Sequence, residues 1–288
     1  MFKNEDEAVT SAVMAMILEV SGNPKAGNVD RDHNFPDLKY EHFIASAVSS
    51  FPVFRMAAKK ELSCGELILR AVEDSSKWHK AKNVHFGAFL LLIPLLANWD
   101  AENSAKAGEL SLQYLKNTTY KDSLHVLNAF RISSARVMGS KKLDLRDDDT
   151  ERFITEERVN LYKWMSMAPK DNIIAKEIIN SYTISVKQSR KLIEWYKELD
   201  DLNHAIVLCY HDMLSRLIDP LIISKFGRDA ALEVSKKAGE IMNLPEKQRL
   251  DKIKEFDEEL IEKGINPGSV ADLTISTIYL AMLDGLRF

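Results

Sequence analysis

The sequence predicts an all-α fold. Only 11 glycines and 8 prolines interrupt its 288 residues, and the apolar residues between them recur at helical rather than alternating spacing. Hydrophobic residues make up 45% of the chain and charged residues 28%, a composition that can bury a sizeable core. No internal repeat, low-complexity tract or clear linker divides the chain. We therefore expect residues 1–288 to form a single globular domain of about a dozen helices around a central buried helix.

The first predicted helix runs from Glu5 to Val20, where apolar residues form one stripe and Glu19 lies near the end. The break after it, Ser21–His33, contains two glycines, a proline and residues of both charge signs. Glycine permits a positive φ or the close approach of a ligand. Loops between helices often carry functional side chains, although many do not. This break is the first candidate for a functional loop. Its ionisable residues are Lys25, Asp30, Arg31, Asp32 and His33.

The next helices lead to the segment predicted to be most buried. We expect a helix over 40–59, kinked at Pro52, and another over 65–80. Residues 89–96 are apolar all round but far fewer than the roughly 20 that cross a membrane, so their helix should be central. Asn83 and His85 precede it and suggest a site whose floor is the core. The alternative is that Asn83 caps the helix and His85 is an ordinary histidine at the edge of the core.

The remaining elements continue the helical pattern. Helices are expected at about 101–115, 120–138, 151–167, 170–199, 200–217, 228–242 and 246–263. Residues 266–273 start the last helix, which is expected to end at residue 287. Asp171 is placed to cap one of them, and Ser269 with Asp272 resembles a capping box at the start of the last. The acidic segment 141–151 could hold a metal. Blocks of like charge are usually solvated, however, and the spacing does not match a calcium loop, which favours a solvated loop.

Composition and charge narrow the classes of function. Lysine and arginine total 39 against 43 for aspartate and glutamate, and the resulting net charge of -4 gives no reason to expect binding to nucleic acid or to a membrane surface. Cys64 and Cys209 are far apart in the sequence, as expected for buried thiols in a reducing compartment. The acidic N-terminal residues lack the order of a signal peptide, so we expect a cytoplasmic protein.

Several well-known motifs are absent from the sequence. Gly22 and Gly27 have the opening spacing of a phosphate-binding loop, but Asn28 follows where a lysine is required. The chain has no His-Glu-x-x-His, no Gly-x-Ser-x-Gly and no Cys/His spacing suited to zinc. Glu194 and Glu198 share a helix face in the manner of the all-α nucleotide pyrophosphohydrolases. A magnesium-dependent pyrophosphohydrolase and a non-catalytic helical interaction protein are therefore kept as alternatives.

Four sequence segments, in order, resemble those of one enzyme family. The family's Pro-Lys-Pro-Gly-x-Val-Asp-Arg corresponds to Pro-Lys-Ala-Gly-Asn-Val-Asp-Arg at 24–31, and its Asn-Thr-His-Lys-Gly-Ala to Asn-Val-His-Phe-Gly-Ala at 83–88. Its Asp-x5-Arg-Gly-Gly is similar to residues 219–227, and its Pro-Gly-Gly-Ser-Ala-Asp-Leu to residues 267–273. On these motifs, which span nearly the whole chain, the sequence resembles the ATP:dephospho-coenzyme A triphosphoribosyltransferases, also called triphosphoribosyl-dephospho-CoA synthases.

The departures from the family motifs follow a pattern. Ala26 replaces a proline, Phe86 replaces the lysine after the histidine, Lys225 replaces an arginine and Phe226 replaces a glycine. With these substitutions the chain resembles the diverged, archaeal-type branch of the family. Because two of them alter cations that would meet phosphates, they leave open the acceptor substrate and the retention of activity.

The resemblance implies a transferase that uses ATP and dephospho-CoA. The 2′-hydroxyl of 3′-dephospho-CoA, or of a related nucleotide-type cofactor precursor, attacks C1′ of the ATP ribose, adenine leaves and the triphosphate stays on the product. Carboxylates would stabilise the positive charge at C1′, and a carboxylate or histidine would deprotonate the hydroxyl. Mg²⁺ and cationic side chains would hold the triphosphate. A homodimer is an expected assembly.

The resemblance also implies which residues form the site. The predicted catalytic residues are Glu19, Asp30, His85 and Asp272. The predicted substrate-binding residues are Lys25, Gly27, Arg31, Asn83, Gly87, Lys225, Gly268 and Ser269. The predicted magnesium ligands are Asp30, Asp219 and Asp272, with the individual roles of the carboxylates left open. We expect the four segments to converge on one pocket with residues 83–96 at its back, and Asp30 to be a surface position where asparagine changes stability by roughly 0.5 kcal/mol or less.

Overall fold

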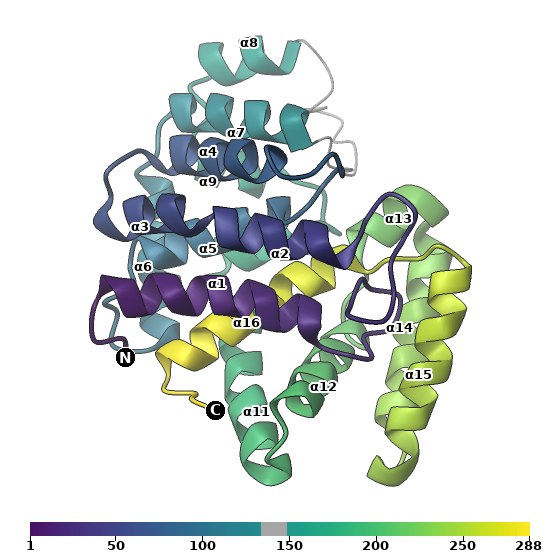
Figure 1. Cartoon of the computed structure of the whole chain (residues 1–288). Helices are drawn as coiled ribbons and strands as arrows, with labels where there is room; N and C mark the ends of the chain where they lie inside the picture. The colour runs from purple at the N-terminus through teal and green to yellow at the C-terminus, as the bar shows by residue number, and fades with distance from the viewer. Residues whose placement is uncertain (134–148) are drawn as a thin grey trace.

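Sixteen α-helices and no β-strand occur in the computed structural model over the residues that it describes, 1–133 and 149–288 (Figure 1). The all-α prediction is thus confirmed. In chain order the helices are α1 (Glu5–Ser21), α2 (Tyr40–Ser49), α3 (Phe51–Lys59), α4 (Cys64–Ser76), α5 (Phe86–Leu96), α6 (Ser104–Lys116), α7 (Tyr120–Ser133), α8 (Asp149–Glu156), α9 (Leu161–Ser166), α10 (Ile173–Ile179), α11 (Thr183–Leu199), α12 (Leu202–Leu214), α13 (Pro220–Phe226), α14 (Arg228–Met242), α15 (Glu246–Glu262) and α16 (Gly268–Leu283).

Helices α5 and α16 form the centre of the molecule. Every side chain of α5 is buried, as its all-round apolar pattern predicted, and α4, α6 and α16 pack against it. Helix α16 is also buried along most of its length and packs against α1, α11 and α12 (Figure 1). The two central helices meet near their N-termini, where Gly87 lies against Asp272. Across the described residues, none of the helices has the length and apolar character needed to cross a membrane.

Two long predicted helices are each divided. The helix expected over 40–59 ends at Ser49 and resumes as α3, with Pro52 in the first turn of α3, where a missing N–H needs no partner. The helix expected over 170–199 is divided into α10 and α11 at Ser181 and Tyr182, whose φ angles of 55° and 60° are left-handed. The kink predicted at Pro52 lies close to the first break, whereas the sequence spacing did not indicate the second.

Tertiary contacts explain the second break. The Glu177 side chain accepts hydrogen bonds from the backbone N–H groups of Ile184 (3.1 Å) and Ser185 (2.7 Å), so it satisfies donors at the start of α11. The buried Tyr182 hydroxyl donates to the carbonyl of Leu91 in α5 at 3.0 Å. The break therefore joins α11 to the central helix.

Three smaller predictions differ from the structure or fall outside it. The helix expected over 151–167 is divided into α8 and α9. Asp171 pairs with Arg228, and Asn172 caps α10 in its place. Residues 134–138 of the helix predicted over 120–138 and residues 141–148 of the acidic segment lie outside the described residues.

The loop between α1 and α2, residues 22–39, is fastened to helices from the second half of the chain. Asn203 of α12 accepts a hydrogen bond from the backbone N–H of Asn23 and donates one to its carbonyl. The Tyr210 hydroxyl, also from α12, donates to the carbonyl of Ala26 at 3.0 Å. These contacts hold the first family-like segment in place against the rest of the molecule.

Candidate active site

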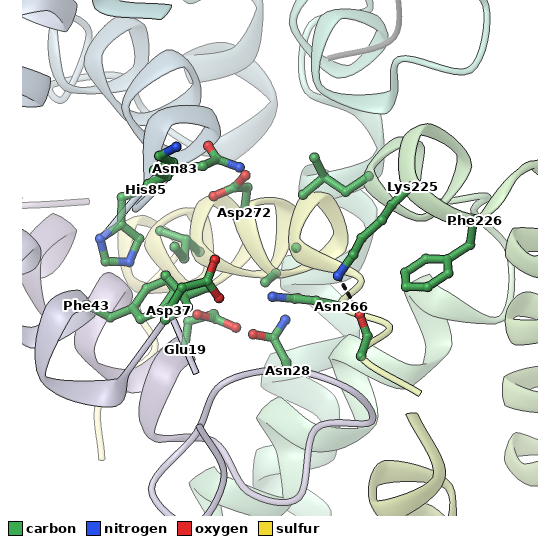
Figure 2. Close-up of a pocket in the computed structure, with 17 residues that line it drawn as sticks. Glu19, Asn28, Asp37, Phe43, Asn83, His85, Lys225, Phe226, Asn266 and Asp272 are labelled. Atoms are coloured by element: carbon green, nitrogen blue, oxygen red, sulfur yellow. Dashed lines mark hydrogen bonds between the residues drawn. The ribbon is translucent and has the colours of Figure 1, made fainter. Parts of the chain in front are cut away.

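A pocket opens where α1, the 22–39 loop, the start of α5, α13 and the start of α16 meet (Figure 2). Each of the four family-like segments contributes to its lining. Of the residues predicted for the site, the lining includes Glu19, Asn83, His85, Lys225, Gly268 and Asp272. It also includes polar residues that sequence reasoning missed: Asn28, Asp37, Lys82 and Asn266. The expected convergence of the four segments is therefore seen, with the start of α5 at one side of the pocket (Figure 2).

Asp272 projects from α16 against the first turn of α5. A Cβ atom on Gly87 would lie 2.2 Å from Asp272 Oδ2, so the glycine leaves the space that this carboxylate occupies. Burial raises the pKa of Asp272 well above its usual range, the charges of Glu19 and Asp219 raise it further, and the backbone N–H of Ala88 opposes the rise. Asp272 is consequently a stronger base, when ionised, than an ordinary aspartate.

Glu19 faces the pocket from the end of α1 and pairs with a buried lysine. Lys25 Nζ lies 3.1 Å from Glu19 Oε1 and donates to the carbonyl of Val29 at 3.1 Å. Burial raises the pKa of Glu19, the charge of Lys25 lowers it, and Asp30 raises it again. Lys25 was predicted to bind substrate, but it is fully buried and does not line the pocket. Its geometry is that of a counter-ion for Glu19.

His85 is held in one orientation at the start of α5. Its Nδ1 lies 3.0 Å from Ser46 Oγ, and its buried Nε2 has no hydrogen-bond partner among the described residues. Burial lowers the pKa of His85 to about 3, with a smaller contribution from His79, so the imidazole is neutral at physiological pH. Asn83 and His85 both adopt left-handed φ angles, 55° and 60°, and His85 rather than Asn83 is the residue at the N-cap of α5.

Two lysines carry the positive charge of the pocket lining in the described part of the chain. Lys225 Nζ donates to the carbonyl of Gly264 at 3.0 Å across the pocket rim. Lys82 immediately precedes the second family-like segment, residues 83–88, and lines the pocket. Within that segment Phe86 replaces the family's lysine, and its ring packs against Phe130 in the core. A cation is therefore present beside the second segment, although at a different position from the one the family motif supplies.

Five residues predicted to bind substrate do not line the pocket: Lys25 and Gly87, described above, and Arg31, Gly27 and Ser269. Arg31 is exposed, and its guanidinium lies 3.5 Å from the side chain of Asn203. Gly27 has a φ of 72°, and a Cβ there would lie 2.5 Å from the carbonyl oxygen of Ile265, so packing requires this glycine. Ser269 is buried in the first turn of α16. The structure therefore gives these residues supporting positions around the pocket.

Asp219 caps two helices at once. Its Oδ1 accepts from the backbone N–H of Leu221 at 2.7 Å, and its Oδ2 accepts from that of Val270 at 2.9 Å. Burial raises the pKa of Asp219 to about 6, although these backbone donors oppose the rise. The capping box predicted from Ser269 and Asp272 is therefore not how α16 begins. With both oxygens bound by backbone groups, Asp219 has a geometry suited to holding helices rather than a metal ion.

Asp30 is fully buried, contrary to the prediction of a surface position. Its Oδ1 accepts from the backbone N–H of His33 at 2.9 Å, and it lies beside Asp257 of α15, a residue that no motif indicated. The predicted magnesium ligands Asp30, Asp219 and Asp272 do not form one group. Within the described residues, the set of three whose donor atoms lie within 4.8 Å of one another is Asp30, His33 and Asp257.

The helical fold and this pocket define an all-α enzyme whose site combines carboxylates, a neutral histidine and lysines. The chain belongs to the ATP:dephospho-CoA triphosphoribosyl transferase family, whose model matches residues 5–287. A crystal structure assigned as a triphosphoribosyl-dephospho-CoA synthase from Archaeoglobus fulgidus is 39% identical, has a TM-score of 0.72, and covers 85% of this chain and 100% of its own. No curated protein shows significant similarity to the chain.

Proposed function

We propose that the chain transfers the 5-triphosphoribosyl group of ATP to the 2′-hydroxyl of 3′-dephospho-CoA, or of a related nucleotide-type cofactor precursor, and releases adenine. The observation that carries this proposal is the convergence of all four family segments on one pocket. Two polar atoms of the lining, His85 Nε2 and Asn266 Oδ1, are buried and have no hydrogen-bond partner among the described residues. A bound nucleotide could supply those partners, since buried polar atoms are seldom left unpaired.

Glu19 and Asp272 are the groups best placed to stabilise charge at the reacting carbon. The reaction forms a bond between the acceptor 2′-oxygen and C1′, and it breaks the bond between C1′ and N9 of adenine. As that bond breaks, C1′ develops positive charge, and carboxylates facing the pocket stabilise it. The bonding electrons leave with adenine, which takes up a proton from solvent.

Asp272 is the proposed acceptor of the proton that leaves the 2′-hydroxyl. Its raised pKa makes its carboxylate the stronger base, whereas the pKa of about 3 makes neutral His85 a weak one. His85, fixed through Ser46, instead offers Nε2 as a hydrogen-bonding group that orients a substrate. This division of roles gives each group the task that its environment favours.

The triphosphate requires positive charge, which the lysines and a metal ion can provide. Lys82 and Lys225 line the pocket and can bind phosphate oxygens. Glu19 offers the oxygen donors that Mg²⁺ prefers, and Mg²⁺ is often held by one or two carboxylates together with substrate phosphates. Asp272 is left free to accept the proton. When bound there, Mg²⁺ would neutralise part of the charge of the triphosphate. Asp30 and Asp219 are not part of this proposed magnesium site.

Product analysis tests the proposal against the two alternatives. Purified protein is incubated with ATP and magnesium, with and without dephospho-CoA, and the nucleotides are separated by chromatography. Release of adenine only in the presence of the acceptor supports the transfer. Release of pyrophosphate without an acceptor would indicate a pyrophosphohydrolase, and no turnover with any acceptor precursor would favour an interaction protein. Glu194 and Glu198, which suggested a pyrophosphohydrolase, are exposed on α11 and do not line the pocket.

A further inference from the structure

A second group of ligand-type side chains lies outside the pocket lining, between the 22–39 loop and α15. Asp30 and His33 come from the loop and Asp257 from α15. His33 Nδ1 lies 2.9 Å from Asp257 Oδ2 and 3.7 Å from Asp30 Oδ1. One donor atom from each residue falls within 4.8 Å of the other two. This spacing is that of ligands around a single ion.

The carboxylates of this group carry oxygens that the described residues leave unpaired. Asp30 Oδ2 and Asp257 Oδ2 are buried and accept no hydrogen bond, and the two side chains are at most 1% exposed. His33 Nδ1, despite its short distance to Asp257, also makes no hydrogen bond. Lys25 of the same loop also acts on Asp257 through its charge, but its ion pair is with Glu19. Backbone N–H groups bond one oxygen of each carboxylate, and His33 is the nearest group that could carry positive charge. Two buried carboxylates that share a single imidazole are costly unless a further cation binds them.

We propose that the chain binds one divalent transition-metal ion, of the Zn²⁺ class, through Asp30, His33 and Asp257. Imidazole nitrogen together with carboxylate oxygen suits Zn²⁺, Co²⁺ and Mn²⁺ better than Mg²⁺, which takes oxygen ligands. Three protein ligands leave a fourth tetrahedral position for water. His33 is 33% exposed, so water and the ion can reach the group from its side.

The ion has a clear structural consequence. It joins the loop to α15, beside the hydrogen bond of 2.8 Å that Gly27 N–H donates to Asp257 Oδ1. The same loop carries Asn28 and Asp37 into the pocket lining. The metal therefore fixes the position of these two side chains from outside the pocket, whichever substrate the pocket takes.

Direct metal binding tests the proposal without any nucleotide. The full chain is stripped with a chelator and titrated with Co²⁺, whose visible absorption reports its ligands, and bound Co²⁺ is then displaced with Zn²⁺. We expect one saturable equivalent of Co²⁺ that a roughly 10-fold excess of Mg²⁺ does not displace, because a site with an imidazole ligand favours Co²⁺ strongly over Mg²⁺. His33→Gln and Asp257→Asn should each weaken binding by on the order of a hundredfold. His204→Gln, on α12 outside the group, is the matched control and should bind as the parent does.

Two results would overturn the proposal. One is the absence of a saturable Co²⁺ equivalent in the parent, and the other is an equivalent that both variants retain with parental affinity, because it would then lie elsewhere. His33→Gln leaves the contact between Gly27 and Asp257 intact, so it tests the site even if Asp257→Asn fails to fold. Circular dichroism of each stripped variant verifies that the protein measured is folded. Since no nucleotide is present, failure of the transferase assay would not affect this outcome.

Discussion

Replacing Gly87 with alanine should separate the effect on catalysis from the effect on folding. The new Cβ would lie 2.2 Å from Oδ2 and 2.8 Å from Cγ of Asp272, so the carboxylate must move. Because the clash is with the end of a flexible side chain rather than with backbone, the loss of stability should be about 1 kcal/mol or less, below the usual range for overpacking a rigid core. Displacing a catalytic carboxylate by about 1 Å can lower the rate roughly a hundredfold.

The assay is adenine release from ATP in the presence of the acceptor, measured beside a thermal melt. Gly239→Ala in α14 is the matched control, because its nearest neighbours would be 3.8 Å and 4.0 Å away. That variant should keep parental activity and gain up to about 1 kcal/mol from the higher helix propensity of alanine. If Gly87→Ala releases adenine at the parental rate, the position of the Asp272 carboxylate is not what the reaction requires.

Three further predictions concern groups in and around the site. Because burial raises the pKa of Asp272, kcat/KM should fall as the pH drops through this raised pKa, well above the pKa of an ordinary aspartate. A pH profile of adenine release in which activity falls only near pH ~4 would contradict this. Asp30→Ala should lower the unfolding free energy by about 1–3 kcal/mol in urea titrations, because the part-buried backbone N–H groups of Asp32 and His33 lose their acceptor, and an unchanged midpoint would refute it. In the same titrations Gly27→Ala should lower the unfolding free energy by about 2–4 kcal/mol, because the new Cβ would meet the backbone of Ile265. Gly285 also has a positive φ but no neighbour near its Cβ position, so Gly285→Ala should lower it by only about 1 kcal/mol.

The fold could be predicted as far as local patterns determine it. The run 89–96 is apolar on every side, and a helix of that kind has no stable place except the centre, where α5 lies. The break between α10 and α11 was missed because it depends on Glu177, which caps α11 from the preceding helix, and on Tyr182, which bonds to α5. Neither contact leaves a periodic signal in the sequence.

The site could be predicted only in part, because a motif shows which residues belong together but not which of them face a ligand. Glu19 and Asp272 line the pocket as expected. Lys25 and Asp219 also belong to the predicted site, but Lys25 pairs with Glu19 and Asp219 holds two helix starts. Lys82 had a weak signal, since it adjoins the second motif, whose usual lysine is missing. Asp257 had none, because it is one of many acidic residues on the charged helix α15.

The double cap made by Asp219 limits how the pocket can open. One side chain fixes the start of α13, which carries Lys225, to the start of α16, which carries Asp272. A movement of either helix start would break a buried hydrogen bond unless the other start moved with it. Lys225 and Asp272 therefore lie on one rigid side of the pocket. A wider entrance for a substrate therefore requires movement on the opposite side of the pocket, in the 22–39 loop. The contacts of this loop with α12 and α15 then control access to the pocket.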